Sequence, residues 1–223
     1  IIYLYRRKEA FGFDFKIQSF KVRFIILKPM IKLGFPLALQ YAAISISMLF
    51  VNSYINSFGL VASAVTGVGN KLRQVMSIIT RSIATAGSSM VGQNMGAGKP
   101  ERVKQMVRTA CIICFSAAIV FSCVFLAFPK QIFSIFDKNP EVLDWAPRYM
   151  VTIALAFGSF AVMAPFNALI NGTGFAALSF VIALLDGVVS RIGLSLLLGL
   201  TFKMGIEGFW YGSALAGYST GLV

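Results

Sequence analysis

Long apolar runs, separated by short polar segments, dominate the chain. They cover residues 32–56, 60–93, 109–128, 149–170 and 176–200, and a further run begins at residue 205. A helix needs roughly 20 mainly apolar residues to cross a bilayer, and each of the first five runs reaches that length. The pattern predicts an all-α integral membrane protein, a bundle of six membrane spans whose last span is cut short. Residues 1–31 are predicted to hold the end of a preceding helix and a basic linker.

The second run, residues 60–93, carries a polar stripe. Its members recur at steps of three or four and therefore share one helix face. They are Asn70, Gln74, Ser77, Arg81, Thr85 and Ser88. A stripe with a central arginine cannot face lipid without a large free-energy cost, so it must face protein or water. It either lines a water-filled cavity or only hydrogen-bonds neighbouring helices. We expect Arg73, nearer the end of the run, to extend its charged group towards the membrane surface.

Two polar residues in other runs are candidates for transport chemistry. Gln40 either contacts a substrate or binds the backbone of a neighbouring helix. Asp186 is the only acidic residue near the centre of a run. A lone acid inside a membrane is by default a proton or cation site, so Asp186 is a candidate for ion coupling. The alternative is a structural ion pair, with Arg81 as a partner. Arg191 lies five residues on, about 140° round an α-helix, which predicts no same-face pair with Asp186.

Composition and charge narrow the function classes. The chain is 57% hydrophobic and only 13% charged, whereas a soluble domain has about 25% charged residues. Membrane lipid is therefore its expected solvent and partner. The net charge of +12 does not indicate nucleic-acid binding, because most cations flank apolar runs instead of forming one basic face. Twelve cations lie before residue 33 or in the 99–108 loop, against four in the loops predicted on the other side. This bias predicts a multi-pass protein of the cell membrane with a cytoplasmic N-terminal linker.

Enzyme chemistry finds little support in the sequence. The chain has no histidine, and the spacing of Cys111 and Cys114 has no second ligand pair to complete a metal site. No nucleophile–base set or carboxylate pair is evident, so we expect neither an enzyme nor a bound cofactor. Small residues spaced four apart, as at Gly208 and Gly212, predict close helix approach. The neighbouring Trp210 suits a membrane interface.

Several short motifs together identify a resemblance. Residues 91–104, VGQNMGAGKPERVK, resemble the loop between the second and third spans of a lobe in the multidrug and toxic compound extrusion (MATE) transporters. Residues 33–40 (LGFPLALQ), 167–174 (NALINGTG) and 205–210 (GIEGFW) are similar to helix ends of the second lobe of that family. The residues that carry the loop motif and one recurrent arginine are Gly92, Gln93, Asn94, Gly96, Gly98, Lys99 and Arg191.

The resemblance implies a twelve-helix transporter with two six-helix lobes that face each other across a central cavity. Residues 32–223 would be the C-terminal lobe, with the missing N-terminal lobe as its partner. The family exports organic cations or amphipathic drugs in exchange for H⁺ or Na⁺, and Asn167 would join the cavity-lining residues. Phe50, Tyr54 and Phe166 are possible aromatic wall residues, with core packing as the favoured alternative. The coupling acid lies either in the missing lobe or at Asp186.

Two alternatives stay open at this point. One is a lipid-linked oligosaccharide flippase of the same superfamily, for which Arg81 and Arg191 could hold a pyrophosphate. The other is a non-transporting membrane subunit. The polar stripe argues against the second, because burying six polar groups for packing alone is costly.

Overall fold

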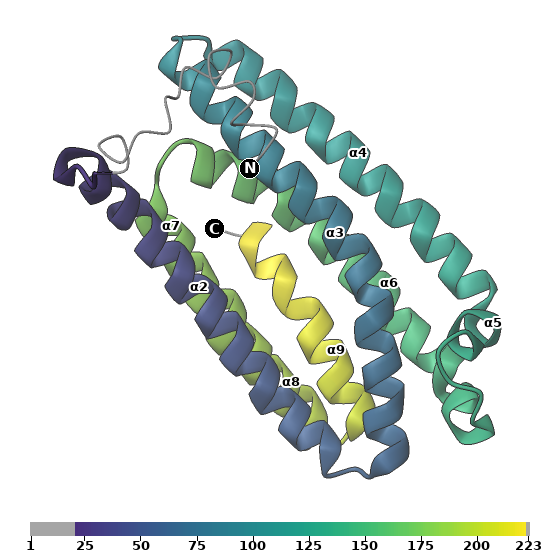
Figure 1. Cartoon of the computed structure of the whole chain (residues 1–223). Helices are drawn as coiled ribbons and strands as arrows, with labels where there is room; N and C mark the ends of the chain where they lie inside the picture. The colour runs from purple at the N-terminus through teal and green to yellow at the C-terminus, as the bar shows by residue number, and fades with distance from the viewer. Residues whose placement is uncertain (1–20, 222–223) are drawn as a thin grey trace. The chain divides into compact units, whose positions relative to one another are not determined.

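A computed structural model describes residues 21–221, and every regular element in this range is helical (Figure 1). The predicted end of a preceding helix at residues 1–5, and the linker up to residue 20, lie outside the described residues. The chain divides into two compact units, one before Pro36 and one from Pro36 onward. In the first unit, the described residues form the beginning of the first helix. Apart from the part of this first helix before Pro36, all elements discussed below belong to the second unit.

The helices agree with the predicted order of apolar runs. They are α2 (Phe24–Asn56), α3 (Leu60–Gly96), α4 (Pro100–Ala127), the short α5 (Pro129–Ser134) and α6 (Pro140–Gly172), followed by α7 (Ala176–Leu184), η2 (Leu185–Ser190), α8 (Arg191–Leu196), η3 (Leu197–Thr201), α9 (Ile206–Ala216) and η4 (Gly217–Gly221). The segments η2 and η3 are π-helical and η4 is a 3₁₀-helix. The all-α fold class predicted from the sequence is confirmed.

Four helical stretches within residues 21–221 are long and apolar enough to cross a membrane. They are Phe24–Asn56, Pro100–Ala127, Pro140–Gly172 and Leu178–Thr201. The 37-residue α3 is longer than any of them, but it carries the polar stripe. Together they confirm an integral membrane protein, because a chain this apolar satisfies its backbone within helices when lipid surrounds it.

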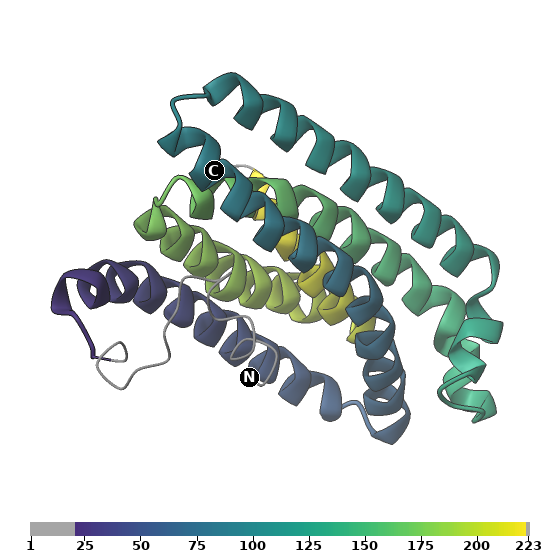
Figure 2. The same ribbon diagram turned by 45° about the horizontal axis from the view of Figure 1, so that its top comes forward.

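Helix α6 is the centre of the second unit. It packs against α3, α4 and α9, and Figure 2 shows α3, α4 and α6 running alongside one another. Its fully buried side chains include Tyr149, Ile153 and Phe157. Phe157 meets Phe125 of α4 edge to face, with ring centroids 5.3 Å apart. This core excludes lipid from one face of α3 and leaves the opposite face open.

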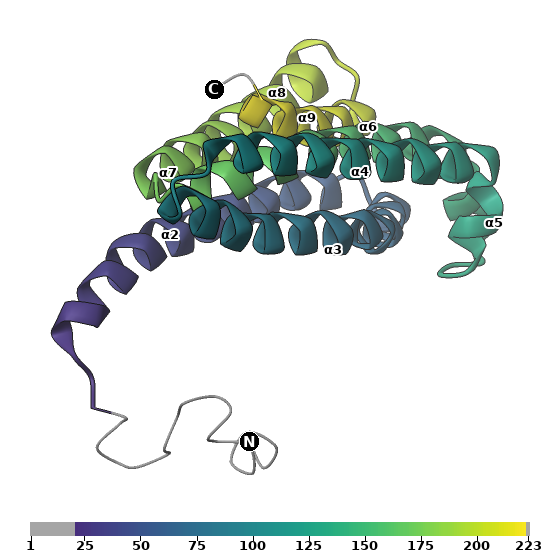
Figure 3. The same cartoon turned by 90° about the horizontal axis from the view of Figure 1, so that it is seen from above.

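Small residues bring α9 against the helix before it. A Cβ added at Gly208 would lie 2.5 Å from the backbone nitrogen of Gly199, and one at Gly212 would lie 2.4 Å from that of Ser195. The close approach predicted from this glycine spacing is therefore confirmed. Figure 3 shows α8 and α9 side by side at the edge of the bundle.

Two helices begin before their apolar runs, and the predicted interface residue Trp210 is buried. Helices α4 and α6 begin at Pro100 and Pro140 instead of residues 109 and 149, since proline fits the first helical turn and the Asn139 side chain caps α6 at Glu141 N, 3.0 Å away. Trp210 is buried in the bundle and does not present its indole to lipid. It is 2% exposed, and its indole N–H donates to Thr66 Oγ1 at 2.9 Å.

Candidate functional site

A cavity of about 710 Å³ lies within the second unit. Its walls come from α2, α3 and α6, from the π-helical segment η2 with the adjoining α8, and from α9. The volume suits a drug-sized organic molecule, since ligand pockets commonly measure about 300–1,000 Å³. The cavity is the principal candidate for a functional site.

The residues predicted to line a cavity come together at this one. All seven are part of its wall: Gln40, Asn70, Gln74, Ser77, Arg81, Thr85 and Asn167. Ser88 of the same stripe, Asp186 and Arg191 line it too. Asn70, Gln74, Arg81 and Thr85 are exposed, whereas Gln40 is only 7% exposed. The stripe thus faces open space in the described chain, and its part in transport stays a prediction.

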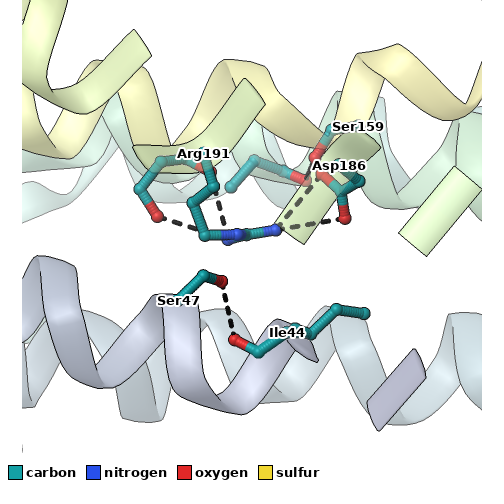
Figure 4. A network of polar contacts seen from close by, with 7 residues as sticks. Ile44, Ser47, Ser159, Asp186 and Arg191 are labelled. Atoms are coloured by element: carbon teal, nitrogen blue, oxygen red, sulfur yellow. Dashed lines mark hydrogen bonds and ion pairs between the residues drawn. The ribbon is translucent and has the colours of Figure 1, made fainter. Parts of the chain in front are cut away.

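Asp186 and Arg191 face each other, contrary to the α-helical expectation (Figure 4). The Arg191 Nη2 group donates to both carboxylate oxygens of Asp186, at 3.3 and 3.4 Å. The sequence argument was wrong because it assumed 3.6 residues per turn, whereas η2 is a π-helix. A π-helix pairs residue i with residue i+5, and this brings the two side chains onto one face. The structural partner of Asp186 is Arg191, not Arg81.

The pair is buried and only partly satisfied. Asp186 is 1% and Arg191 5% exposed. Arg191 Nη1 also donates to the backbone oxygen and the hydroxyl of Ser213, each at 3.3 Å. All these distances exceed the 2.7–2.9 Å or so of a strong charge-assisted hydrogen bond. The Nε atom of Arg191 is buried with no partner among the described residues. The two side chains are therefore held close to each other by long hydrogen bonds.

Arg73 is a cavity residue that the sequence argument misplaced. Instead of extending to the membrane surface, it is 8% exposed and lines the cavity. Its guanidinium carbon lies 5.9 Å from the centroid of the Phe160 ring. The steps from Asn70 through Arg73 to Ser77 are three and four residues, so the helical period that revealed the stripe could have included it. The nearby Lys71 is exposed and lies over the Phe136 ring, outside the cavity.

The aromatic residues of the wall are not the three that the sequence offered as possible wall residues. Tyr41, Tyr149, Phe160 and Trp210 line the cavity. Phe50, Tyr54 and Phe166 are not among the lining residues, and the Tyr54 ring stacks instead on Phe209 at 5.4 Å. The sequence could not separate these sets, since both are aromatic residues in apolar helices.

The loop motif lies apart from the cavity. None of its residues is part of the cavity wall. Gly92, Gln93, Asn94 and Gly96 form the last turns of α3. Gly98 has a φ of +67°, a conformation that favours glycine, and the N–H of Lys99 donates to the Asn94 oxygen at 2.9 Å. The motif therefore shapes the turn into α4.

Metal ligation has no visible basis in residues 21–221, where no three His, Cys, Asp or Glu side chains gather. The cavity offers instead amides, hydroxyls, a few charges and aromatic rings. Such a wall binds an organic molecule by shape, hydrogen bonds and cation–π or stacking contacts.

Comparison with known proteins decides the family. The MatE family model matches residues 36–202. The chain belongs to the MatE family. This MatE chain is 25% identical over 213 residues to the probable multidrug resistance protein YoeA of Bacillus subtilis, covering 95% of the chain and 46% of YoeA. It is 29% identical over 112 residues to an FAD transporter of Shewanella oneidensis, covering 49% of the chain and 24% of that protein.

Solved structures share the fold of this MatE chain. A MOP superfamily transporter from Pyrococcus furiosus, described as having a binding pocket of reverse polarity, matches with a TM-score of 0.88 at 19% identity. The match covers 99% of this chain and 50% of that one. The chain thus spans about half the length of the solved structures and curated relatives that it matches over most of its length, consistent with one lobe of a two-lobe transporter.

Proposed function

We propose that this MatE chain is one lobe of a secondary active antiporter that exports amphipathic organic compounds, organic cations included, in exchange for H⁺ or Na⁺. The observation that carries the proposal is the cavity, where the polar stripe of α3 faces aromatic residues of α6 and α9. A wall of this kind suits flat amphipathic molecules. Relatives bearing the name of multidrug resistance proteins support the same substrate class.

Asp186 is the coupling residue that we propose for this lobe. It is the only carboxylate on the described cavity wall, and it is paired with Arg191 within a buried site. Taking up H⁺ or Na⁺ there would weaken its attraction to Arg191 and so favour another arrangement of the lobe. The free-energy difference between the two arrangements would then depend on the ion gradient.

We further propose that the chain is the C-terminal lobe and that the linker before α2 is cytoplasmic. The motifs at residues 33–40 and 205–210 support the lobe assignment, and the distribution of cations supports the orientation. Transport would then need the other lobe, since alternating access rocks one repeat against the other around a shared site.

A lipid-linked oligosaccharide flippase is the second candidate. Three arginines on the cavity wall favour it, because guanidinium groups bind pyrophosphate through paired hydrogen bonds. A substrate of this kind would move along the membrane and would not collapse an ion gradient when a soluble drug is added. A non-transporting subunit fits less well, because an open polar cavity would serve no function in it.

Inverted membrane vesicles that contain the full-length protein test the proposal. Ethidium would be added while an imposed pH gradient is followed, with and without Na⁺. Collapse of the gradient on ethidium addition supports proton-coupled export, and ethidium uptake that requires Na⁺ supports sodium coupling. If neither occurs with ethidium or with neutral and anionic amphiphiles, the antiporter proposal is wrong and the flippase becomes the leading candidate.

A further inference from the structure

The charges on the cavity wall do not balance. Arg73, Arg81 and Arg191 line the cavity, whereas Asp186 is the only acidic residue on the described wall. Arg191 already pairs with Asp186 at 3.3 Å. Neither Arg73 nor Arg81 has a carboxylate within ion-pair distance among residues 21–221. The described part of the cavity therefore carries two positive charges with no anionic partner.

Arg73 is the more deeply buried of these two arginines. It is only 8% exposed and lines the cavity together with the fully buried Tyr149. Its guanidinium lies over the Phe160 ring, which contributes only a partial attraction. A charged side chain this buried in a membrane bundle is costly unless an opposite charge meets it. Because Arg73 lines the cavity, such a charge can reach it from there.

The residues around Arg73 also indicate what kind of molecule would carry the opposite charge. Phe160 and Tyr149 supply apolar surface next to the guanidinium, and Arg81 lies two helical turns further along the same wall. A flat apolar body beside a carboxylate or phosphate would meet all three groups together. An organic cation would instead be repelled by both arginines unless another part of the protein neutralised them.

We propose that the cavity holds an anion subsite centred on Arg73, which binds the carboxylate or phosphate of an amphipathic molecule. This inference rests on the proposed transport function and narrows its substrate class from amphipathic compounds in general to amphipathic anions. Both an exported organic acid and an anionic lipid have such an anionic group beside an apolar body.

Binding measurements on the purified full-length protein test the subsite without requiring transport. The probes share one aromatic body: pyrenebutyrate is an anion, pyrenebutanol is neutral, and pyrenebutyl-trimethylammonium is a cation. Energy transfer from tryptophan to pyrene reports binding, since Trp210 lies in the cavity wall. We expect the anion to bind more tightly than the cation. Arg73→Gln should weaken anion binding about tenfold or more, because a hydrogen bond to a charged group is lost.

Three further variants separate charge from folding. Arg73→Lys keeps the charge and should keep the preference for the anion. Arg81→Gln, at an exposed position, should weaken anion binding less than Arg73→Gln does. Lys71→Gln removes a neighbouring charge outside the cavity and should change every dissociation constant less than about twofold. Unchanged binding of pyrenebutanol shows that a variant has kept its fold.

The proposal is overturned if the cation binds as tightly as the anion, or if Arg73→Gln leaves anion binding unchanged. The second result would mean that a carboxylate elsewhere in the protein neutralises Arg73. If the anion preference is found, short-chain phosphatidylglycerol is added as a competitor of bound pyrenebutyrate. Displacement by a lower concentration of this lipid than of free pyrenebutyrate assigns the subsite to a lipid headgroup, and the reverse assigns it to an exported acid. A protein that shows the anion preference but fails the vesicle assay would disprove antiport and leave the subsite standing.

Discussion

The buried pair of Asp186 and Arg191 is the residue-scale feature that links stability to the proposed coupling of transport. Both side chains are buried, and the distances between them are long for an ion pair. Removing one member of a buried pair costs roughly 3–5 kcal/mol, because the other charge is left without a partner. A loss of transport on mutation of Asp186 alone would therefore combine lost coupling with lost stability. A single variant and a double variant of the pair are needed to separate the two effects.

Asp186→Asn should impair transport and lower the thermal midpoint, while the protein still inserts into the membrane. The double variant Asp186→Asn with Arg191→Gln removes both charges and should recover most of the lost stability, as measured by thermal unfolding in detergent. If Asp186 couples the ion, the double variant stays inactive in the vesicle assay. Undiminished efflux by either variant would remove Asp186 from the mechanism.

The hydrogen bond from Trp210 to Thr66 joins α9 to α3 inside the core. Thr66→Val keeps the shape but leaves the buried indole N–H without an acceptor, which we expect to lower the free energy of unfolding by about 1–3 kcal/mol. Thr109→Val is the matched control. Its hydroxyl bonds only its own helix and is exposed, so stability should change little. Equal effects of the two substitutions would show that this bond does not stabilise the core.

At the scale of elements, the π-helical turn η2 determines the site geometry. It brings residues five apart onto one face, and its Gly187 lies against α2, where an added Cβ would be 3.3 Å from the Ile44 backbone. Figure 4 shows Ile44 and Ser47 across from the Asp186–Arg191 pair. Single π-turns inside helices are frequent at functional sites. Both members of the pair lie on or next to this turn, so we expect a shift of the turn to move the pair relative to the cavity.

The contact of α9 with α8 and η3 gives the clearest test of element packing. Gly212→Ala would put a methyl group 2.4 Å from the Ser195 backbone nitrogen, so the helices must separate. We expect a loss of about 1–3 kcal/mol of stability, measured by thermal unfolding. Gly193→Ala is the control, because nothing lies within 4 Å of its added Cβ. It should be neutral or stabilising by up to about 1 kcal/mol, and a destabilisation equal to that of Gly212→Ala would contradict the packing described.

The sequence predicted the elements better than it predicted the site. Hydrophobic runs gave the order of the helices, and the three-to-four spacing from Asn70 to Ser88 placed one wall of a cavity. The π-turn was not predictable, because the hydrophobic pattern does not mark a local change from i+4 to i+5 hydrogen bonding, and with it the Asp186–Arg191 pair was missed. Arg73 was misplaced for another reason. Its depth depends on Phe160 and Tyr149, which lie far along the chain.

At the scale of the whole molecule, the proposed function makes the chain one wall of a transport pathway. Four of the six stripe residues of α3 are exposed in a chain that spans about half the length of relatives such as YoeA. A polar face that is open in one lobe is where a second lobe would complete the cavity. If the stripe lines a transport pathway, water reaches it and a bound substrate blocks that access.

Ser77 is the position at which to measure that access. It lies in the middle of the stripe and lines the cavity. A cysteine would replace it in a cysteine-free full-length protein, and a membrane-impermeant thiol reagent would be applied with and without substrate, using pyrenebutyrate and ethidium in turn. The account predicts labelling that one of these compounds slows. A cysteine that stays unreactive from both sides of the membrane, or that reacts equally fast with either compound present, would contradict it.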